Sequence, residues 1–376
     1  MVTTSSRFRI DVPDETLADL RARLDHARWP DHLLVVGRED GDRLRHVHRL
    51  WERWRSDFDW RRQERQLNDL PQHLLEVDGM RLHVVHARSA SVPPRPLLPV
   101  HGWPSSFVEY ARVVPLPTAA PPGPGFDVVV PTRPGYGFSD AGRLRDGSED
   151  ADGDLFTRLM TDVLGYDRFL AHGDDFGGSI VSRMACRHPG TVRAIHVSEW
   201  LEPPVPDGAS LGPDERRYLE SLAAWREAER GYGHIAATRP QTLGLALDDS
   251  PLGLLAWIAD KFLSWTDPRP DGRLQFDADF LLTVTTLYWV TRSMTTSMRS
   301  YAAADAGGGP VPVPAGVVAP REEHPAPPRS WLERSYADLR SYRIRTRGGH
   351  FLAAEDPGAF VAELTGFFAQ VAPRDP

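Results

Sequence analysis

Residues 169–178 read Phe-Leu-Ala-His-Gly-Asp-Asp-Phe-Gly-Gly and join a short apolar run to a turn that is rich in glycine. A helix-like segment follows at 179–188, so the pattern predicts a strand, a sharp turn and a helix. Asp175 stands in the turn with Gly173 and Gly177 as its second neighbours. Glycine suits a turn in which neighbouring backbone comes very close. The pattern favours Asp175 as a nucleophile, with a plain flexible turn as the alternative.

The segments around this turn predict a largely parallel sheet. Short apolar runs that read as buried strands alternate with helix-length segments, namely 97–100, 126–130, 169–171, 194–197, 313–318 and 342–346. This alternation is typical of the α/β class. The runs 74–77 and 81–87 flank Asp78-Gly79, a pair that favours a tight hairpin turn. A strand followed by Gly-x-nucleophile-x-Gly and a helix is the nucleophile elbow of the α/β-hydrolase fold, which is therefore the fold we expect.

Helical periodicity fills two further parts of the chain. Residues 1–75 contain a helix-start signal and amphipathic runs, so we expect an N-terminal helical extension there. Residues 201–305 are rich in Leu, Trp and Tyr, have helical spacing and interrupt the strand pattern. We therefore expect a helical cap at 201–305, inserted between two parts of the core at 76–200 and 306–376.

The composition restricts the possible functions. The 376 residues carry a net charge of −8, and their arginines are interleaved with Asp and Glu, which argues against a nucleic-acid surface. Cys186 is the only cysteine, so an intramolecular disulfide and a cysteine metal cluster are excluded. His46 and His48 are loosely spaced and lack an evident third ligand, so we expect no metal site.

Location and source are expectations from the same composition. The N-terminus lacks the apolar segment of a signal peptide, and no run approaches the roughly 20 apolar residues of a spanning helix. We therefore expect a cytoplasmic protein without a membrane partner, and we consider a homodimer. Lys261 is the only lysine among many arginines, a bias that points to a bacterial genome of high GC content.

A second motif, His-Gly-Trp-Pro at 101–104, directly follows the strand expected at 97–100. In the α/β-hydrolase fold the loop after this strand supplies one backbone donor of the oxyanion hole, and the residue after the nucleophile supplies the other. These donors would be the N–H groups of Trp103 and Phe176. Pro104 could fix the loop through a cis peptide bond. A tight loop with a packed tryptophan is the alternative.

The motif Arg347-Gly-Gly-His350-Phe directly follows the last expected strand, where the chain order nucleophile, acid, histidine requires the base. We interpret His350 as that base, with a packed or helix-capping histidine as the alternative. An acid must orient the imidazole and stabilise its charged form. Glu322 and Glu323 follow the strand expected at 313–318. We favour Glu322, and Glu323 or a solvated pair are the alternatives.

With these residues the chain resembles the microsomal-type epoxide hydrolases over nearly its whole length. The resemblance is carried by Phe8-Arg-Ile-Asp-Val-Pro, Asp19-Leu-Arg-Ala-Arg-Leu, Phe58-Asp-Trp-Arg, the His-Gly-Trp-Pro loop, Arg133-Pro-Gly-Tyr-Gly-Phe-Ser, Arg347-Gly-Gly-His and the highly specific segment 231–244. It implies that Tyr232 and Tyr301 are cap tyrosines that donate hydrogen bonds to the epoxide oxygen. Without the resemblance, either tyrosine would read as a packed residue of a helical cap.

Two positions depart from the family pattern. The family usually has Gly-Gly-Asp-Trp-Gly at the elbow, where this chain has Gly-Asp-Asp-Phe-Gly, so Asp174 competes with Asp175 as the nucleophile. Only Asp175 has glycine at both second neighbours, and we expect it to be the nucleophile. The acid segment is usually Phe-Pro-x-Glu, of which Pro320 and Glu322 remain. That supports Glu322 and leaves Glu323 open.

The expected function is an epoxide hydrolase that acts on a small molecule and needs no metal or organic cofactor. Asp175 would open the epoxide while Tyr232 and Tyr301 stabilise the developing alkoxide. His350, oriented by Glu322, would then activate water against the resulting ester. The resemblance extends to bacterial enzymes of natural-product metabolism, which makes a bulky biosynthetic epoxide one possible substrate.

Three other functions compete with this interpretation. A serine esterase is excluded because no hydroxyl stands at the elbow. A haloalkane dehalogenase shares the Asp nucleophile, but Phe176 replaces the tryptophan that commonly follows it there. A catalytically inactive hydrolase fold that binds a ligand would not need Asp175, His350 and an acid together.

Overall fold

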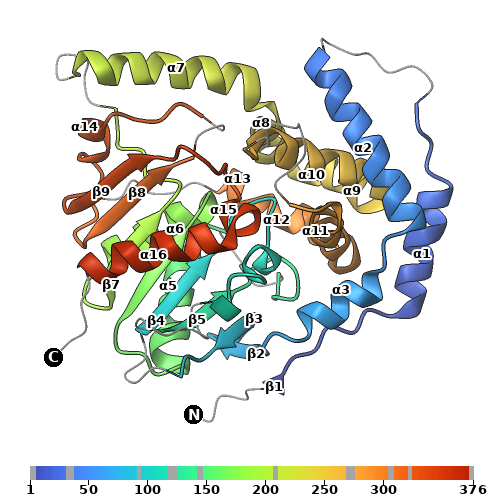
Figure 1. The fold of residues 1–376 in the computed structure, drawn as a ribbon, viewed down its shortest axis with the longest axis horizontal. Coiled ribbons are helices and arrows are strands. Elements are labelled where there is room, and N and C mark those ends of the chain that lie inside the picture. Colours follow the sequence, from blue (N-terminus) through green and yellow to red (C-terminus); the bar gives the residue numbers. More distant parts are fainter. Residues whose placement is uncertain are drawn as a thin grey trace.

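The computed structural model describes residues 6–30, 38–90, 95–116, 125–141, 147–205, 211–267, 276–303, 309–320 and 324–371. These residues form one nine-stranded sheet in the order β1-β2-β3-β5-β4-β6-β7-β8-β9 (Figure 1). The strands are β1 (Ser6–Arg7), β2 (Gln72–Val77), β3 (Met80–Ala87), β4 (Arg95–Val100), β5 (Phe126–Pro131), β6 (Phe169–Gly173), β7 (Val192–Val197), β8 (Ala315–Ala319) and β9 (Leu339–Ile344). The six neighbouring strands β5, β4, β6, β7, β8 and β9 run parallel to one another. β1, β2 and β3 add antiparallel pairs at one edge.

The predicted hairpin is confirmed. Asp78 and Gly79 connect β2 to β3 with φ angles of 52° and 73°. A two-residue turn with positive φ at both positions matches the twist of the strands that it joins.

Several predicted boundaries differ from the structure by a few residues. β9 runs from Leu339 to Ile344, earlier than the expected 342–346, because its pairing with β8 begins at the buried Leu339 and ends at Ile344. α6 begins at Phe176, three residues before the expected 179–188, because the sharp turn is complete at Asp175. β4 begins at Arg95, two residues before the expected 97–100, in a stretch that contains Pro96.

Two prolines fit into β4 because each lies where the strand pairs on one side only. Pro96 pairs with β5, and the pairing with β6 starts at Leu97. Pro99 pairs with β6, after the pairing with β5 has ended. Since proline has no N–H to donate, it is tolerated in a strand where one side needs no ladder bond.

Helices cover both faces of the sheet. The core helices are the 3₁₀ turn η1 (Phe107–Tyr110), α5 (Glu149–Arg158), the π-helical turn η2 (Leu159–Val163), α6 (Phe176–Arg187), α14 (Arg329–Leu332), α15 (Leu352–Glu355) and α16 (Pro357–Val371). Successive strand residues pack into two different hydrophobic clusters. Leu97 joins the cluster that contains α16, and Leu98 joins the cluster that contains α5 and α6. This is the alternation expected of a sheet that is buried on both faces.

The chain between β7 and β8 is helical and lies beyond one end of the sheet (Figure 1). Its helices are α7 (Pro213–Glu229), α8 (Gly231–Thr238), α9 (Pro240–Asp249), α10 (Pro251–Trp265), α11 (Ala278–Thr291), α12 (Met294–Ser297) and α13 (Arg299–Ala302). We call this segment the cap. Ser250 begins α10 with a capping hydrogen bond to the Gly253 N–H over 3.0 Å.

The N-terminal helices pack against the cap and join it to the sheet. They are α1 (Asp14–Asp25), α2 (Arg38–Ser56) and α3 (Trp60–Leu67). α2 contacts α10 and α11, and the Trp54 Nε1–H donates to the Thr286 hydroxyl over 3.0 Å (Figure 1). Within the described ranges, no helix has the length and apolar character needed to cross a membrane.

The register of the parallel strands brings their following loops together. Val100 of β4 pairs with Gly173 of β6, so the loop that holds Trp103 starts beside the turn that holds Asp175. Ala319 of β8 pairs with Ile344 of β9 at the same end of the sheet. Ligand sites of open α/β sheets form at this carboxyl end of the strands.

Candidate active site

The turn between β6 and α6 holds Asp175 in a backbone conformation that residues other than glycine rarely adopt. Its φ is 48° and its ψ is −130°. A Cβ added to Gly177 would lie 2.0 Å from the carbonyl oxygen of Val100, and one added to Gly102 would lie 2.3 Å from the Asp175 Cβ. Glycine is therefore required at both positions. Backbone strain of this kind concentrates at functional sites, where the surrounding packing enforces it.

The loop after β4 approaches the Asp175 carboxylate from the neighbouring strand. The Trp103 N–H donates a hydrogen bond to Asp175 Oδ1 over 2.8 Å. The Trp103–Pro104 peptide bond is cis, as the sequence suggested. Phe176 is the first residue of α6, so its N–H belongs to the helix turn that has no acceptor within the helix. The structure thus brings Trp103 to Asp175, and Phe176 adjoins it in the chain.

His350 lies on the loop after β9 and is 6% exposed. Its backbone N–H donates to the carbonyl oxygen of Trp265 over 2.9 Å. The centroids of the His350 and Trp265 rings lie 5.0 Å apart. A Cβ added to Gly349 would lie 2.3 Å from the same carbonyl oxygen, so this close approach requires glycine. Because Trp265 is the last residue of α10, the cap itself holds the loop of His350.

A buried carboxyl closes the same loop. Glu355 Oε2 accepts the N–H of Gly349 over 2.9 Å, and Oε1 accepts the N–H of Phe351 over 3.2 Å. Burial raises the pKa of Glu355 to about 7, although these donors oppose the shift. Sequence reasoning missed Glu355. The signal was a glutamate within an apolar segment five residues after His350.

The acid expected to orient His350 lies outside the described residues. Glu322 and the alternative Glu323 follow β8, which ends at Ala319, and the described chain resumes at His324. The role of either glutamate stays a prediction.

Asp174 belongs to a buried carboxyl pair behind the turn. It is 4% exposed, its carboxyl interacts electrostatically with that of Glu109, and its Oδ2 accepts the Tyr110 hydroxyl over 3.2 Å. Burial raises the pKa of Glu109 well above its ordinary value and also raises that of Asp174, whereas the nearby His350 lowers both. Two buried carboxylates repel each other when both are ionised, so the pair favours one proton, and the stronger rise in pKa favours Glu109 as the group that holds it. Sequence reasoning did not single out Glu109.

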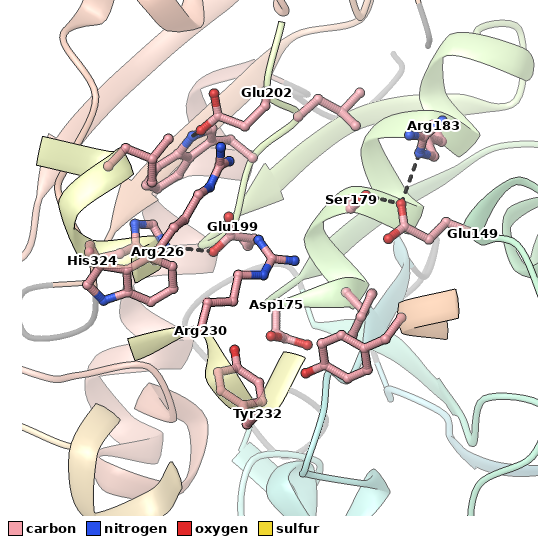
Figure 2. Close-up of a pocket in the computed structure, with 16 residues that line it drawn as sticks. Glu149, Asp175, Ser179, Arg183, Glu199, Glu202, Arg226, Arg230, Tyr232 and His324 are labelled. Atoms are coloured by element: carbon pink, nitrogen blue, oxygen red, sulfur yellow. Dashed lines mark hydrogen bonds and ion pairs between the residues drawn. The ribbon is translucent and has the colours of Figure 1, made fainter. Parts of the chain in front are cut away.

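Two cap tyrosines face the Asp175 carboxylate. Tyr232 on α8 stacks on the Trp103 ring, with 5.7 Å between centroids and 6° between planes. Tyr301 on α13 meets the Trp103 ring edge-on at 5.5 Å. Both tyrosines line a cavity of about 300 Å³ together with Asp175 and Phe176 (Figure 2). Burial raises the pKa of Tyr301 well above its ordinary value, so its hydroxyl stays protonated and can donate.

The Arg-Pro-Gly-Tyr motif fastens the core to the segment that carries Tyr301. The Arg133 Nη2–H donates to the Ser300 hydroxyl over 2.7 Å, and the Tyr136 hydroxyl donates to the carbonyl oxygen of Ser297 over 3.1 Å. Arg133 is 1% exposed, and its charge is balanced by a buried aspartate 3.1 Å away. The motif therefore fixes Tyr301 relative to the sheet.

Lys261, noticed in the sequence only for its rarity, lies behind Tyr232. Its Nζ sits 4.2 Å from the centroid of the Tyr232 ring and 5.5 Å from that of Trp265. The side chain is 8% exposed and forms an ion pair with Asp260 over 2.7 Å. A cation over an aromatic face at this distance attracts the ring electrostatically.

Possible metal ligands do not gather in the part of the chain that the structure describes. No group of three or more His, Cys, Asp or Glu side chains there could hold a metal ion. His46 and His48 lie on α2, away from the sheet, and the His48 ring contacts Trp29 and Trp51.

The fold and this site define an α/β hydrolase with a carboxylate on its elbow. The family model described as "alpha/beta hydrolase fold" matches residues 95–242, and the model described as "Epoxide hydrolase N terminus" matches residues 5–110. These matches confirm the predicted fold class.

Individual relatives agree with the family models. A Stigmatella aurantiaca protein assigned as an epoxide hydrolase is 37% identical, over 97% of this chain and 84% of that protein. "Epoxide hydrolase 1" of Oryctolagus cuniculus is 33% identical, over 97% of this chain and 88% of that protein. The crystal structure of juvenile hormone epoxide hydrolase from Bombyx mori matches with a TM-score of 0.86 at 28% identity, covering 98% of this chain and 95% of that one. The chain belongs to the epoxide hydrolase family, a family of hydrolases that act on ether bonds, and the resemblance seen in the sequence is confirmed.

Proposed function

We propose that this protein hydrolyses epoxides to vicinal diols through an ester on Asp175. The observation that carries the proposal is the position of the Asp175 carboxylate. Trp103 holds one of its oxygens by a hydrogen bond of 2.8 Å, and the carboxylate shares a cavity with Tyr232 and Tyr301. A nucleophile and two oxygen donors therefore meet in one site.

The first half-reaction opens the epoxide ring. A carboxylate oxygen of Asp175 attacks one epoxide carbon, and the bond between that carbon and the epoxide oxygen breaks. Tyr232 and Tyr301 donate hydrogen bonds to the oxygen as it gains charge. One of them transfers its proton, so that the oxygen stays on the second carbon as a hydroxyl group and a tyrosinate remains. The product of this step is a hydroxyalkyl ester of Asp175.

The second half-reaction hydrolyses the ester. His350 takes a proton from water as the water oxygen attacks the Asp175 carbonyl carbon. The backbone N–H groups of Trp103 and Phe176 stabilise the negative oxygen of the intermediate. The intermediate then collapses as the bond between the Asp175 carbonyl carbon and the ester oxygen breaks, and His350 returns its proton to the departing diol oxygen. The alkyl C–O bond of the diol stays intact. Asp175 regains its carboxylate, and the proton that it loses restores the tyrosine. In this proposal Glu322 orients His350, with Glu323 as the alternative.

The site favours an epoxide over a halide as the group that Asp175 displaces. Halide release needs side-chain N–H donors at the cavity wall, and Phe176 stands where dehalogenases commonly have a tryptophan. The Trp103 indole nitrogen is buried and has no hydrogen-bond partner among the described residues, but its ring stacks on Tyr232. Two phenol hydroxyls suit a departing oxygen better, because they can also protonate it.

The trapping of the ester tests the proposal. In His350→Gln the carboxylate can still attack, because Asp175 is ionised at neutral pH, but the water lacks its base. We expect a terminal or aryl epoxide to alkylate the variant about once per chain and then to stall. Intact-mass spectrometry should show one added substrate mass, and peptide mapping should place it on Asp175. Absence of any adduct, together with direct transfer of oxygen from labelled water to the diol in a single turnover, would contradict the covalent mechanism.

A further inference from the structure

The last turns of α7 bring two arginines to the cavity. α7 crosses above the sheet and ends beside α8, which carries Tyr232 (Figure 1). Arg226 and Arg230 both line the cavity that holds Asp175. Side chains four residues apart lie on the same face of a helix, so the two guanidinium groups belong to one wall. Figure 2 draws Arg230 between Glu199 and Asp175.

The other carboxylates of the same cavity have partners within the protein. Glu149 accepts the Arg183 Nε–H over 2.9 Å. Glu199 lies 2.9 Å from the His324 imidazole. Glu149 therefore has a cationic partner, and Glu199 has a histidine ring beside it.

Glu202 has three neutral donors instead. Its oxygens accept the Trp200 Nε1–H over 3.0 Å, the Tyr218 hydroxyl over 2.5 Å and the Trp331 Nε1–H over 2.7 Å. These bonds fix the Glu202 carboxylate in place and use most of its acceptor sites.

The two arginines contrast with these acids. Across the described residues, neither the Arg226 nor the Arg230 guanidinium forms an ion pair or a hydrogen bond, and both side chains are exposed. The charge of Arg230 nevertheless reaches the reaction site, because it opposes the rise that burial causes in the pKa of Tyr301. An arginine pair with free donors is suited to a planar or tetrahedral anion, which it can bind with several parallel hydrogen bonds.

We propose that Arg226 and Arg230 bind an anionic group of the substrate, a carboxylate or a phosphate, while its epoxide lies at Asp175. This assignment rests on the proposed function and names the substrate class. The anion must be remote from the epoxide, because Asp175 would repel a negative charge placed next to the reacting carbon. The cavity volume of about 300 Å³ is at the small end for ligand sites, which favours a compact molecule over a long chain.

A matched set of aryl epoxides tests the assignment. The probes are 4-(oxiran-2-yl)benzoate, its uncharged methyl ester and 4-(oxiran-2-yl)phenyl phosphate, each assayed for diol with the full chain. We expect kcat/KM for at least one anion to exceed that of the ester by on the order of tenfold to a hundredfold, as hydrogen bonds between charged groups imply. High salt should reduce this preference. The anion with the higher kcat/KM identifies the group that the arginines recognise.

Variants locate the effect. In the double variant Arg226→Gln/Arg230→Gln, we expect the ratio of kcat/KM for the anion to kcat/KM for the methyl ester to fall at least tenfold through the KM of the anion, while the methyl ester is still converted to diol. The ester therefore reports whether the variant is folded. Arg216→Gln, at an exposed position of α7 that does not line the cavity, is the matched control and should keep the preference.

Two failures are distinguishable. If the wild-type protein hydrolyses the ester as well as both anions, or the double variant loses activity on all three equally, the anion site is refuted and the hydrolase function stands. If no probe yields diol and none alkylates His350→Gln, the proposed function itself fails.

Discussion

Asp174 and Asp175 are adjacent in the chain but occupy different environments. The Asp175 carboxylate receives the Trp103 N–H and lines the cavity. Asp174 is buried in the core, where it accepts a hydrogen bond from Tyr110 and interacts electrostatically with Glu109. A sequence shows only two consecutive acids, whereas the positive φ of Asp175 turns one of them toward the substrate side.

We predict that Asp175→Asn abolishes turnover and that Asp174→Asn keeps most of it. An amide at 175 cannot attack the epoxide, whereas an amide at 174 keeps an oxygen for the Tyr110 hydroxyl. Steady-state diol formation and single-turnover alkylation of both variants provide the measurement. Loss of alkylation in Asp174→Asn together with activity in Asp175→Asn would reverse the assignment of the nucleophile.

The pH profile of Asp174→Asn gives a second readout of the role of Asp174. The Asp174 carboxylate and a protonated His350 attract each other. Removing that negative charge makes the imidazolium less favourable, so His350 becomes an available base at lower pH. The acidic limb of the kcat–pH profile of Asp174→Asn should therefore move to lower pH. If the acidic limb of the profile did not move, Asp174 would act only in packing.

At the scale of elements, α10 connects the two halves of the site. Lys261 lies 4.2 Å from the Tyr232 ring centroid. Trp265, one helical turn later, contacts the His350 ring, and its carbonyl oxygen accepts the backbone N–H of His350. The buried cation favours negative charge on the Tyr232 phenol oxygen, and so makes the hydroxyl a stronger donor to the departing epoxide oxygen. Cation–π contacts of desolvated groups are worth about 2 kcal/mol.

We predict that Lys261→Met slows ester formation by up to about thirtyfold, the rate equivalent of about 2 kcal/mol. Tyr232→Phe should slow it by on the order of 10²–10³, because one hydrogen bond to the developing oxyanion is lost. Single-turnover alkylation in the His350→Gln background measures both. If the lysine acts through the hydroxyl, Lys261→Met has little further effect once Tyr232 is Phe. Equal effects of Lys261→Met in both backgrounds would assign the lysine to packing alone.

The elements that sequence predicted are those with strong local patterns. The hairpin at Asp78-Gly79 and the turn at Asp175 follow from glycine placement and hydrophobic alternation, which neighbouring residues determine. Tyr232 and Tyr301 came from the family resemblance, because their own segments read as ordinary amphipathic helix.

The contributions that sequence reasoning missed depend on distant contacts. Glu109 meets Asp174 because η1 packs behind the elbow, and Lys261 meets Tyr232 because two cap helices cross. Neither contact leaves a periodic or motif signal in the chain. Pro96 was placed before the strand expected at 97–100, because the tolerance of a strand for proline depends on which neighbouring strand pairs at that position.

At the scale of the whole molecule, Glu355 couples stability to pH. Its folded pKa of about 7 lies above the usual value of about 4.5 because burial disfavours the charged form. Because its pKa is raised on folding, Glu355 makes its full contribution to the free energy of unfolding below about pH 4.5. This contribution is lost as the pH rises through about 7. The difference between these two pKa values corresponds to roughly 3 kcal/mol in the free energy of unfolding.

We predict that Glu355→Gln removes this dependence. The amide stays neutral at every pH and loses one acceptor for the backbone N–H groups of the His350 loop, which costs about 1 kcal/mol independently of pH. The variant should therefore be slightly less stable than the wild type near pH 5 and more stable near pH 8. Urea unfolding followed by circular dichroism across this range measures the difference, and Glu76→Gln at an exposed position of β2 should give a flat difference. Parallel stability curves for the wild type and Glu355→Gln would show that Glu355 is ionised throughout, with its backbone donors outweighing its burial.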